Sequence, residues 1–192
     1  MPDIQFHLAS ASPRRQELLQ QLGLHFDVRS ADIVEHPLPN ETAADYARRM
    51  ALEKALATQA RIGSSLPVLG ADTDVVLDGH ILGKPRDRAD GLAMLALLSN
   101  REHEVYSAVA MVQGTRTEVM LSVTHVTFGV ITPEAAARYW DSGEPADKAG
   151  GYGIQGLGAQ FVKGINGSYS GVVGLPLFET TELLLRFGIH TL

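Results

Sequence analysis

Residues 66–85 constrain the fold of this 192-residue chain most strongly, because an apolar run continues there directly into charged residues. Residues 68–69 and 75–77 are apolar and mostly β-branched or leucine, which is typical of a buried strand. Asp78-Gly79 is a dipeptide that supplies the positive φ angles of a tight two-residue turn, and residues 81–82 are apolar again. The stretch therefore predicts a buried β-hairpin.

Asp72 falls in the middle of the first predicted strand of this hairpin, among core residues. A carboxylate in such a place loses hydration and needs a cation, a metal ion or a hydrogen-bond donor. Lys84 follows the returning strand, so the hairpin could bring it near Asp72. Taken alone, the two residues predict one buried ion pair at a sheet edge; the other charged motifs of the chain favour a functional site.

Composition narrows the possibilities further. With 45% hydrophobic residues the chain can form one sizeable core, so we expect a single domain over residues 1–192. A net charge of −6 argues against a general nucleic-acid binder, and the absence of cysteine excludes disulfides and thiolate chemistry. No signal peptide or membrane-length apolar run is present, so the expected location is cytoplasmic.

The segment after the first predicted strand, residues 4–9, resembles an anion-binding turn. Ser12 is a good N-cap and Pro13 a good first helical residue, and Gly23 ends the predicted helix. Arg14 and Arg15 lie in the first turn, where positive charge interacts unfavourably with the helix dipole. An anion bound between the two arginines would offset this effect. Two solvated arginines on an exposed turn explain the motif equally well.

Capping and periodicity predict most of the remaining elements. Thr42 and Asp87 cap two helices, Thr132-Pro133 opens a third that ends at Gly143, and a last helix follows Pro176. The predicted further strands are 26–33 (weakly), 105–112, 119–130 and 159–162.

Residues 147–156 are rich in glycine and contain a formal G-x-G-x-x-G at Gly151, Gly153 and Gly156. We reject a dinucleotide-binding motif, because no predicted strand precedes it and no acidic residue follows about 20 positions on. The glycines instead predict close approach of the backbone to a ligand. The seven histidines lack metal-ligand spacing, and neither a nucleophile elbow nor a Walker A loop occurs.

The remaining unusual residues combine cations with carboxylates near strand ends. This combination suits a polyphosphate bound with a divalent metal, because phosphoryl chemistry needs cations, oxygen ligands for Mg²⁺ or Mn²⁺, and a base for water. The residues concerned are Arg14, Arg15, Glu35, Lys54, Asp72, Lys84, Lys148 and Gln155.

Five groups of motifs, in order along nearly the whole chain, resemble the Maf family. They are Ser10-x-Ser12-Pro13-Arg14-Arg15, Gly70-Ala71-Asp72-Thr73, Lys84-Pro85, Asp147-Lys148-Ala149-Gly150 with Ile154-Gln155-Gly156, and Asn166-Gly167-Ser168-Tyr169 with Val173-Gly174-Leu175-Pro176. The resemblance implies an α/β, two-lobed, inosine-triphosphatase-like fold around an elongated mixed sheet with an interlobe cleft. It also implies a nucleoside triphosphate pyrophosphatase that needs a divalent metal, Mg or Mn, and that forms a homodimer.

Three positions resemble the branch of the family that acts on dTTP and UTP: Arg14, Thr73 and Gln155. An amide such as Gln155 can donate to and accept from a uracil edge, and a small Thr73 suits a small base. A 7-methyl-GTP or inosine-type purine substrate is the alternative that these positions disfavour. A septum-related regulator that binds nucleotide without catalysis is a second alternative, implied by the family's association with cell-division arrest.

The resemblance also assigns roles. Asp72 would activate water and touch the metal, Glu35 would bind the metal, and Thr73 and Gln155 would contact the base. Arg14, Arg15, Lys54 and Lys84 would hold the triphosphate; Ser10, Ser12 and Lys148 are further candidates.

Three positions depart from the family pattern: Val34 stands before Glu35, Gly171 replaces a larger residue, and Asp74 replaces an apolar one. Alternation places Asp74 on the same strand face as Asp72. A third carboxylate there could perturb metal binding or the pKa of the proton acceptor Asp72. A bulge or a local salt bridge is the simpler interpretation of Asp74.

Overall fold

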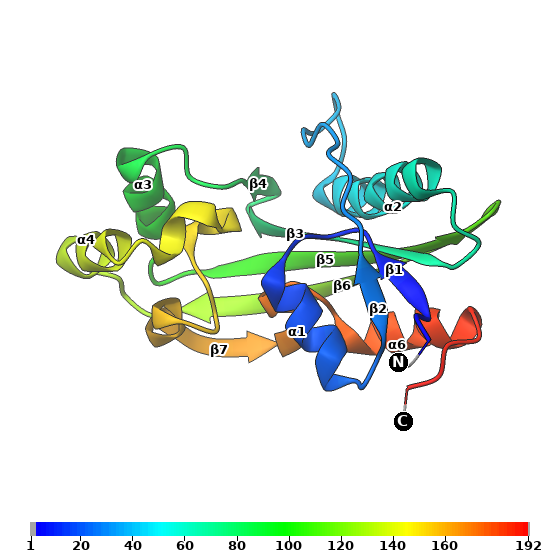
Figure 1. Ribbon diagram of the computed structural model, residues 1–192. Coiled ribbons are helices and arrows are strands. Elements are labelled where there is room, and N and C mark those ends of the chain that lie inside the picture. The colour runs from blue at the N-terminus through cyan, green and yellow to red at the C-terminus, as the bar shows by residue number, and fades with distance from the viewer. Residues whose placement is uncertain (1–2, 192) are drawn as a thin grey trace.

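The computed structural model describes residues 3–191, which form a mixed α/β fold around a seven-stranded sheet (Figure 1). The strand order is β2-β1-β3-β5-β6-β7. Strand β4 lies outside this order and pairs with the C-terminal part of β3. Strands β1, β2 and β3 pair in parallel, and all other pairs are antiparallel. The strands are β1 (Phe6–Leu8), β2 (Phe26–Val28), β3 (Val68–Leu77), β4 (His80–Leu82), β5 (Glu102–Gln113), β6 (Arg116–Phe128) and β7 (Val162–Asn166).

Helices cover both faces of the long strands. Helix α2 lies on one face, α1 and α6 lie on the other, and α3 and α4 lie at one end (Figure 1). The helices are α1 (Pro13–Gln21), α2 (Ala43–Ile62), α3 (Arg88–Leu98), α4 (Pro133–Asp141), α5 (Tyr169–Val173) and α6 (Leu177–Arg186), with short 3₁₀ turns at Glu144–Asp147, Ala149–Gly151 and Leu157–Phe161. None of the helices described in residues 3–191 is long and apolar enough to cross a membrane.

The local signals for the central hairpin and the helix caps are confirmed. Asp78 and Gly79 both have positive φ, 51° and 78°, and β4 pairs with β3 in the predicted register. The Thr42 hydroxyl accepts a hydrogen bond from the Asp45 amide at 3.1 Å, and the Asp87 carboxylate accepts one from the Asp90 amide at 2.9 Å. These elements form where the sequence predicts them because their determinants are local.

Two strand predictions are wrong in extent. Residues 157–161 form a 3₁₀ turn, and the strand begins only at Val162, because the amides of Leu157 and Gly158 donate to the Glu144 side chain instead of to a neighbouring strand. The weak strand predicted over 26–33 is limited to β2, whose ladder to β1 ends at the bond from Arg29 N to Leu8 O.

Two apolar cores lie on the same face of the sheet, one at each end of β3 and β5. Leu69 and Ala71 belong to the core under α1 and α6, whereas Val75 and Leu77 belong to the core beside α3 and α4. Between them on this face lies Thr73, whose hydroxyl contacts that of Ser107 at 3.1 Å. The apolar face is therefore interrupted by polar groups at the middle of β3.

The edge of β3 is also open at its middle. Strand β1 pairs with β3 at Val68 and Leu69, and β4 pairs at Val75 to Leu77. Residues 70–74 consequently have a paired strand on one side only, β5. The edge of β3 is thus unpaired at the point where the two apolar cores separate.

Candidate active site

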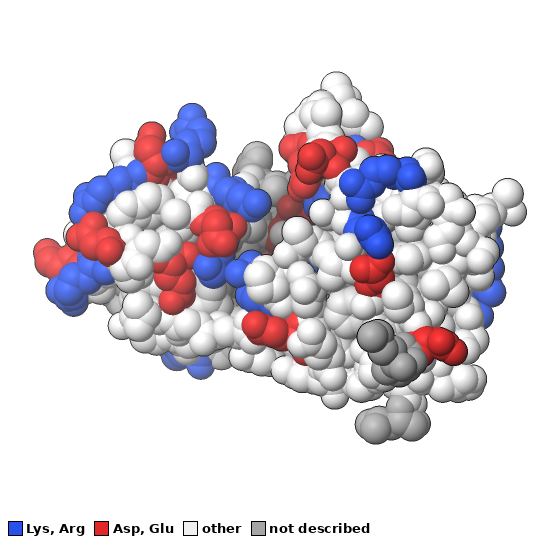
Figure 2. Space-filling view, in the orientation of Figure 1, with Lys and Arg blue, Asp and Glu red and all other residues white. Residues whose placement is uncertain are grey.

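A cleft of about 970 Å³ lies at the open edge of β3. Figure 2 shows the molecule hollowed between the end formed by α3 and α4 and the end formed by α2, with charged side chains of both signs around the hollow. All of the candidate residues named from the sequence line this cleft: Ser10, Ser12, Arg14, Arg15, Glu35, Lys54, Asp72, Thr73, Lys84, Lys148 and Gln155. The fold therefore brings together residues that are up to 145 positions apart in the chain, from Ser10 to Gln155.

Asp72 is the most buried carboxylate of the cleft, with 5% of its surface exposed. Its Oδ1 atom accepts a hydrogen bond from Lys54 Nζ at 2.6 Å, and Lys54 also donates to Glu35 Oε2 at 2.9 Å. The partner is thus Lys54 of α2, not Lys84 as the hairpin suggested, because α2 packs on the face of β3 to which Asp72 points. Gly70 permits this packing, since a Cβ there would lie 2.2 Å from Ala51 O of α2.

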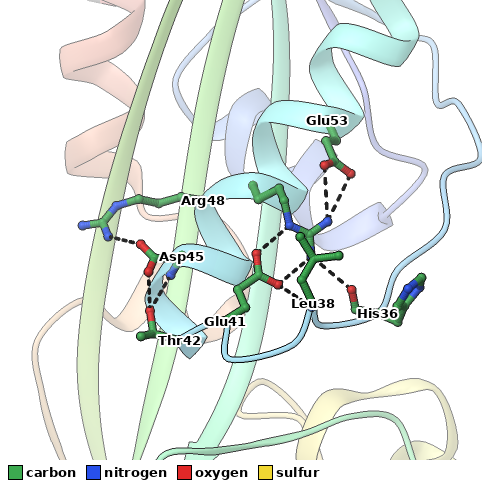
Figure 3. A network of polar contacts seen from close by, with 8 residues as sticks. His36, Leu38, Glu41, Thr42, Asp45, Arg48 and Glu53 are labelled. Carbon is green, nitrogen blue, oxygen red and sulfur yellow. Dashed lines mark hydrogen bonds and ion pairs between the residues drawn. The ribbon is translucent and has the colours of Figure 1, made fainter.

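Arg49 holds the loop before α2 onto this helix through its contacts with His36 and Glu41. Figure 3 shows His36 and Glu41 in this network of polar contacts. Arg49 donates from Nε and Nη2 to the two carboxylate oxygens of Glu41 at 2.6 and 2.7 Å, and from Nη2 to the carbonyl of His36 at 3.0 Å. The hydrogen bond from Arg49 lowers the pKa of Glu41 to about 2, so this carboxylate is charged at neutral pH. We call these contacts of Arg49 with His36 and Glu41 the Arg49 clamp. The clamp fixes the position of residues 36–41, and therefore of the adjacent Glu35, relative to Lys54.

Asp74 lies on the same face of β3 as Asp72, as strand alternation predicts, and is 8% exposed. The bulge is ruled out, because the β3–β5 register is unbroken from Val68 to Val76, and no ion pair within residues 3–191 involves Asp74. Its Oδ2 atom has no hydrogen-bond partner in the described part of the chain. Burial, followed by the nearby charge of Asp72 and a hydrogen bond to it, raises the pKa of Asp74 to about 9.

The two arginines of α1 have different environments. Arg15 donates from Nε to Gly174 O at 2.8 Å, from Nη1 to Ser10 Oγ at 3.0 Å and from Nη2 to Thr73 Oγ1 at 3.4 Å. Burial lowers the pKa of Arg15 from its usual value. Arg14 is half-buried and Lys84 exposed, and no ion pair described in residues 3–191 engages either, so these two cations face the cleft unneutralised. Arg15, in contrast, joins α1 to β3 and to the segment before α6.

The N-terminus of α1 also faces the cleft. Ser12 is the N-cap residue, as predicted, but its side chain makes no capping hydrogen bond. The first-turn amides of α1 therefore keep their capacity to bind an anion, next to Arg14.

The glycine-rich segment forms the opposite side of the cleft. Gln155 is exposed there, whereas Lys148 donates to Glu144 O at 2.8 Å and to Asp147 Oδ1 at 2.7 Å. Sequence reasoning missed Tyr46 and Glu144, which also line the cleft. Neither has a local pattern that marks it: Tyr46 occupies an ordinary apolar position of α2, and Glu144 only follows a glycine.

Comparison with known proteins shows which family has this sequence pattern. Residues 5–187 match the model of the family described as Maf-like protein. The chain belongs to the Maf-like family.

Relatives within the Maf-like family cover almost the whole chain. A protein of Saccharophagus degradans named dTTP/UTP pyrophosphatase is 52% identical over 189 residues, covering 95% of this chain and 89% of the relative. A protein of Pasteurella multocida with the same name is 48% identical and covers 99% of both chains. Among solved structures, the Ham1 protein of Staphylococcus aureus aligns with a TM-score of 0.50 at 16% identity, over 82% of this chain and 79% of that one, which supports the fold alone.

Gly171 lies buried in the short helix α5. Its amide donates to the Ser168 hydroxyl at 3.0 Å, so this helix is capped. A Cβ at residue 171 would lie 3.2 Å from that hydroxyl, which makes glycine the residue that fits without displacement.

Proposed function

We propose that this protein is a nucleoside triphosphate pyrophosphatase that hydrolyses dTTP and UTP to the monophosphate and pyrophosphate. The observation that carries the proposal is the buried Asp72 carboxylate, bonded to Lys54 in a cleft where two further cations, Arg14 and Lys84, form no ion pair with any residue of 3–191. The names of its Maf-like relatives support the substrates.

The donor set of the cleft fits a hard divalent cation. Asp72 and Glu35 are carboxylates that already converge on one cationic atom, Lys54 Nζ, and Asp74 adds an unpartnered oxygen on the same face. In the described residues no cluster of three or more metal-binding side chains is preassembled. Mg²⁺ or Mn²⁺ is commonly held by one or two carboxylates together with substrate phosphates, so Asp72 and Glu35 are the proposed ligands.

The bound metal would supply charge neutralisation on the triphosphate. Asp72 would accept a proton from the water that attacks the α-phosphorus. The bond between the α-phosphorus and the oxygen that bridges it to the β-phosphorus would break, and pyrophosphate would leave. Lys54 would hold Asp72 in position, while Arg14, Lys84 and the first-turn amides of α1 would bind phosphate oxygens. Arg15, whose nitrogens already bond to the protein, would act mainly by fixing α1 beside β3.

Recognition of the base would come from Gln155, supported by Thr73. The exposed amide of Gln155 can donate to O4 and accept from N3–H of uracil or thymine. The Thr73 hydroxyl already contacts Ser107 and Gly174 O, so it would limit the size of the base pocket more than it would bind the base.

A panel of triphosphates tests the proposed function. We expect metal-dependent release of pyrophosphate and monophosphate from dTTP and UTP, and loss of release in EDTA. The panel includes CTP, GTP, ITP and 7-methyl-GTP. Preference for a purine, release of inorganic phosphate instead of pyrophosphate, or tight binding without turnover would contradict the proposal, and the last result would favour the regulator.

The Arg49 clamp predicts a specific effect on metal affinity. Arg49→Gln should raise the Mn²⁺ dissociation constant in the presence of a nucleotide monophosphate by about 10-fold, because loosening a residue that orients a metal ligand has effects of that order. Electron paramagnetic resonance of free Mn²⁺ measures this directly. The neighbouring Arg48→Gln, which removes only an exposed contact to Asp45 at 3.9 Å, is the matched control. Equal effects of the two substitutions would contradict the role of the clamp.

The single domain, the homodimer and the cytoplasmic location that we expect from the sequence stay predictions.

A further inference from the structure

Gln155 lies in a loop that is tied down on both sides by two side chains outside it. Glu144 Oε1 accepts hydrogen bonds from Gly158 N at 3.0 Å and from Tyr139 Oη at 2.7 Å, and Glu144 Oε2 accepts from Leu157 N at 2.7 Å. Tyr139 Oη accepts in turn from Gly153 N at 3.0 Å. The segment from Gly153 to Gly158 is thus bonded at its beginning through Tyr139 and at its end through Glu144.

Two glycines of this loop, Gly156 and Gly158, are explained by the same contacts. A Cβ at Gly156 would lie 2.2 Å from Glu144 Oε2, and a Cβ at Gly158 would lie 2.6 Å from Tyr139 Oη. From the sequence we expected Gly156 to let the backbone approach a ligand; what the backbone approaches there is the carboxylate of Glu144. Ile154 is buried in the core, and Gln155 is the polar side chain of this loop that lines the cleft.

Glu144 is a carboxylate at neutral pH. Burial acts to raise the pKa of Glu144, but the hydrogen bonds from Tyr139, Gly158 and Leu157 lower it below its usual value. A charged acceptor makes stronger hydrogen bonds to backbone amides than a neutral one. Glu144 therefore suits the task of holding a loop that contains four glycines in its 151–158 stretch and would otherwise be flexible.

We propose that Glu144, together with Tyr139, is a positioning residue for base selection: it holds the 153–158 loop so that the Gln155 amide faces the edge of the pyrimidine. This inference rests on the proposed function, because it assigns the base contact to Gln155. Glu144 itself is not a catalytic residue in this arrangement.

The experiment compares UTP with CTP, which share the ribose and triphosphate and differ in the base edge that an amide reads. The selectivity is the kcat/KM for UTP divided by the kcat/KM for CTP. Glu144→Ala should lower this ratio about 10-fold, which is the scale of one well-placed hydrogen bond. The change should come mainly from the KM for UTP. Glu144→Gln, which retains one acceptor oxygen, should recover part of this ratio, and Glu17→Gln, an exposed residue of α1, should leave it unchanged. In the double variant Glu144→Ala/Gln155→Ala the ratio should be no lower than in Gln155→Ala alone.

Hydrogen exchange of the Gly153, Leu157 and Gly158 amides, measured without nucleotide, gives a readout that does not depend on turnover. Faster exchange in Glu144→Ala with a reduced UTP/CTP ratio supports the inference. Faster exchange with an unchanged ratio, additive losses in the double variant, or no recovery by Glu144→Gln would overturn it. If the wild-type protein hydrolyses neither triphosphate, the proposed function fails, and the same ratios measured as binding constants by calorimetry still decide the role of Glu144.

Discussion

Asp72→Asn is expected to lower kcat for dTTP and UTP by about 10²–10⁴-fold, the usual contribution of a general base. The amide keeps the shape of the side chain and an oxygen for Lys54, but it cannot accept a proton from water. Asp72 is almost fully buried and bonded to Lys54 at 2.6 Å, so the substituted amide is held in the same position.

Asp78→Asn is the matched control for this substitution. Asp78 undergoes the same chemical change in the same hairpin, but it lies in the turn, where its side chain contacts Arg101 at 2.7 Å on the surface. Asparagine tolerates the positive φ of that position. Full turnover by Asp72→Asn with metal bound would eliminate Asp72 as the proton acceptor, whereas equal losses in both variants would point to a general effect on the hairpin.

Asp74→Asn is expected to make the protein more stable at neutral pH, and increasingly so as the pH rises. The pKa of Asp74 is about 9 in the folded protein, against a usual value of 3.8. Between these values the folded state binds more protons than the unfolded state, so the stability of the wild-type protein falls as the pH rises through this window. One pKa unit corresponds to about 1.4 kcal/mol, which gives a difference on the order of 4 kcal/mol at pH 7.

Urea unfolding at pH 5, 6, 7 and 8 in the presence of EDTA measures this effect. The free energy of unfolding of Asp74→Asn minus that of the wild type should increase by about 1.4 kcal/mol per pH unit. The cost of burying the new amide is independent of pH and does not change this slope. Parallel pH profiles of Asp74→Asn and the wild type would show that Asp74 is ionised without penalty in the folded protein.

Part of the site was predictable because its signals are local in the chain. The Asp78-Gly79 turn, the Thr42 and Asp87 caps and the start of α1 at Pro13 form as predicted, since each depends on residues within a few positions of one another. The motifs were also sufficient to assemble the set of cleft residues, because those motifs resemble one family across the chain.

The pairings inside the cleft were not predictable in the same way. Lys54 replaces Lys84 as the partner of Asp72 because a 20-residue helix packs against one face of β3, which Gly70 allows. The first three residues of the strand predicted at 159–162 form a 3₁₀ turn instead, because the preceding amides of Leu157 and Gly158 are bonded to Glu144, more than ten residues earlier in the chain. In each case the local sequence pattern is compatible with two arrangements, and a contact with a residue distant in the chain determines which of them forms.

The central hairpin, the helix boundaries marked by caps and the types of residue in the cleft follow from the sequence alone, because propensity, capping and alternation act over short distances. The packing of distant segments sets which carboxylate meets which cation and makes Arg15 join α1 to β3. Within residues 3–191 it also leaves Arg14 without an ion pair and Asp74 Oδ2 without a hydrogen-bond partner. The physical reason is that burial and electrostatic pairing depend on which faces are packed together, and the open edge of β3 between β1 and β4 exists only once the sheet has formed.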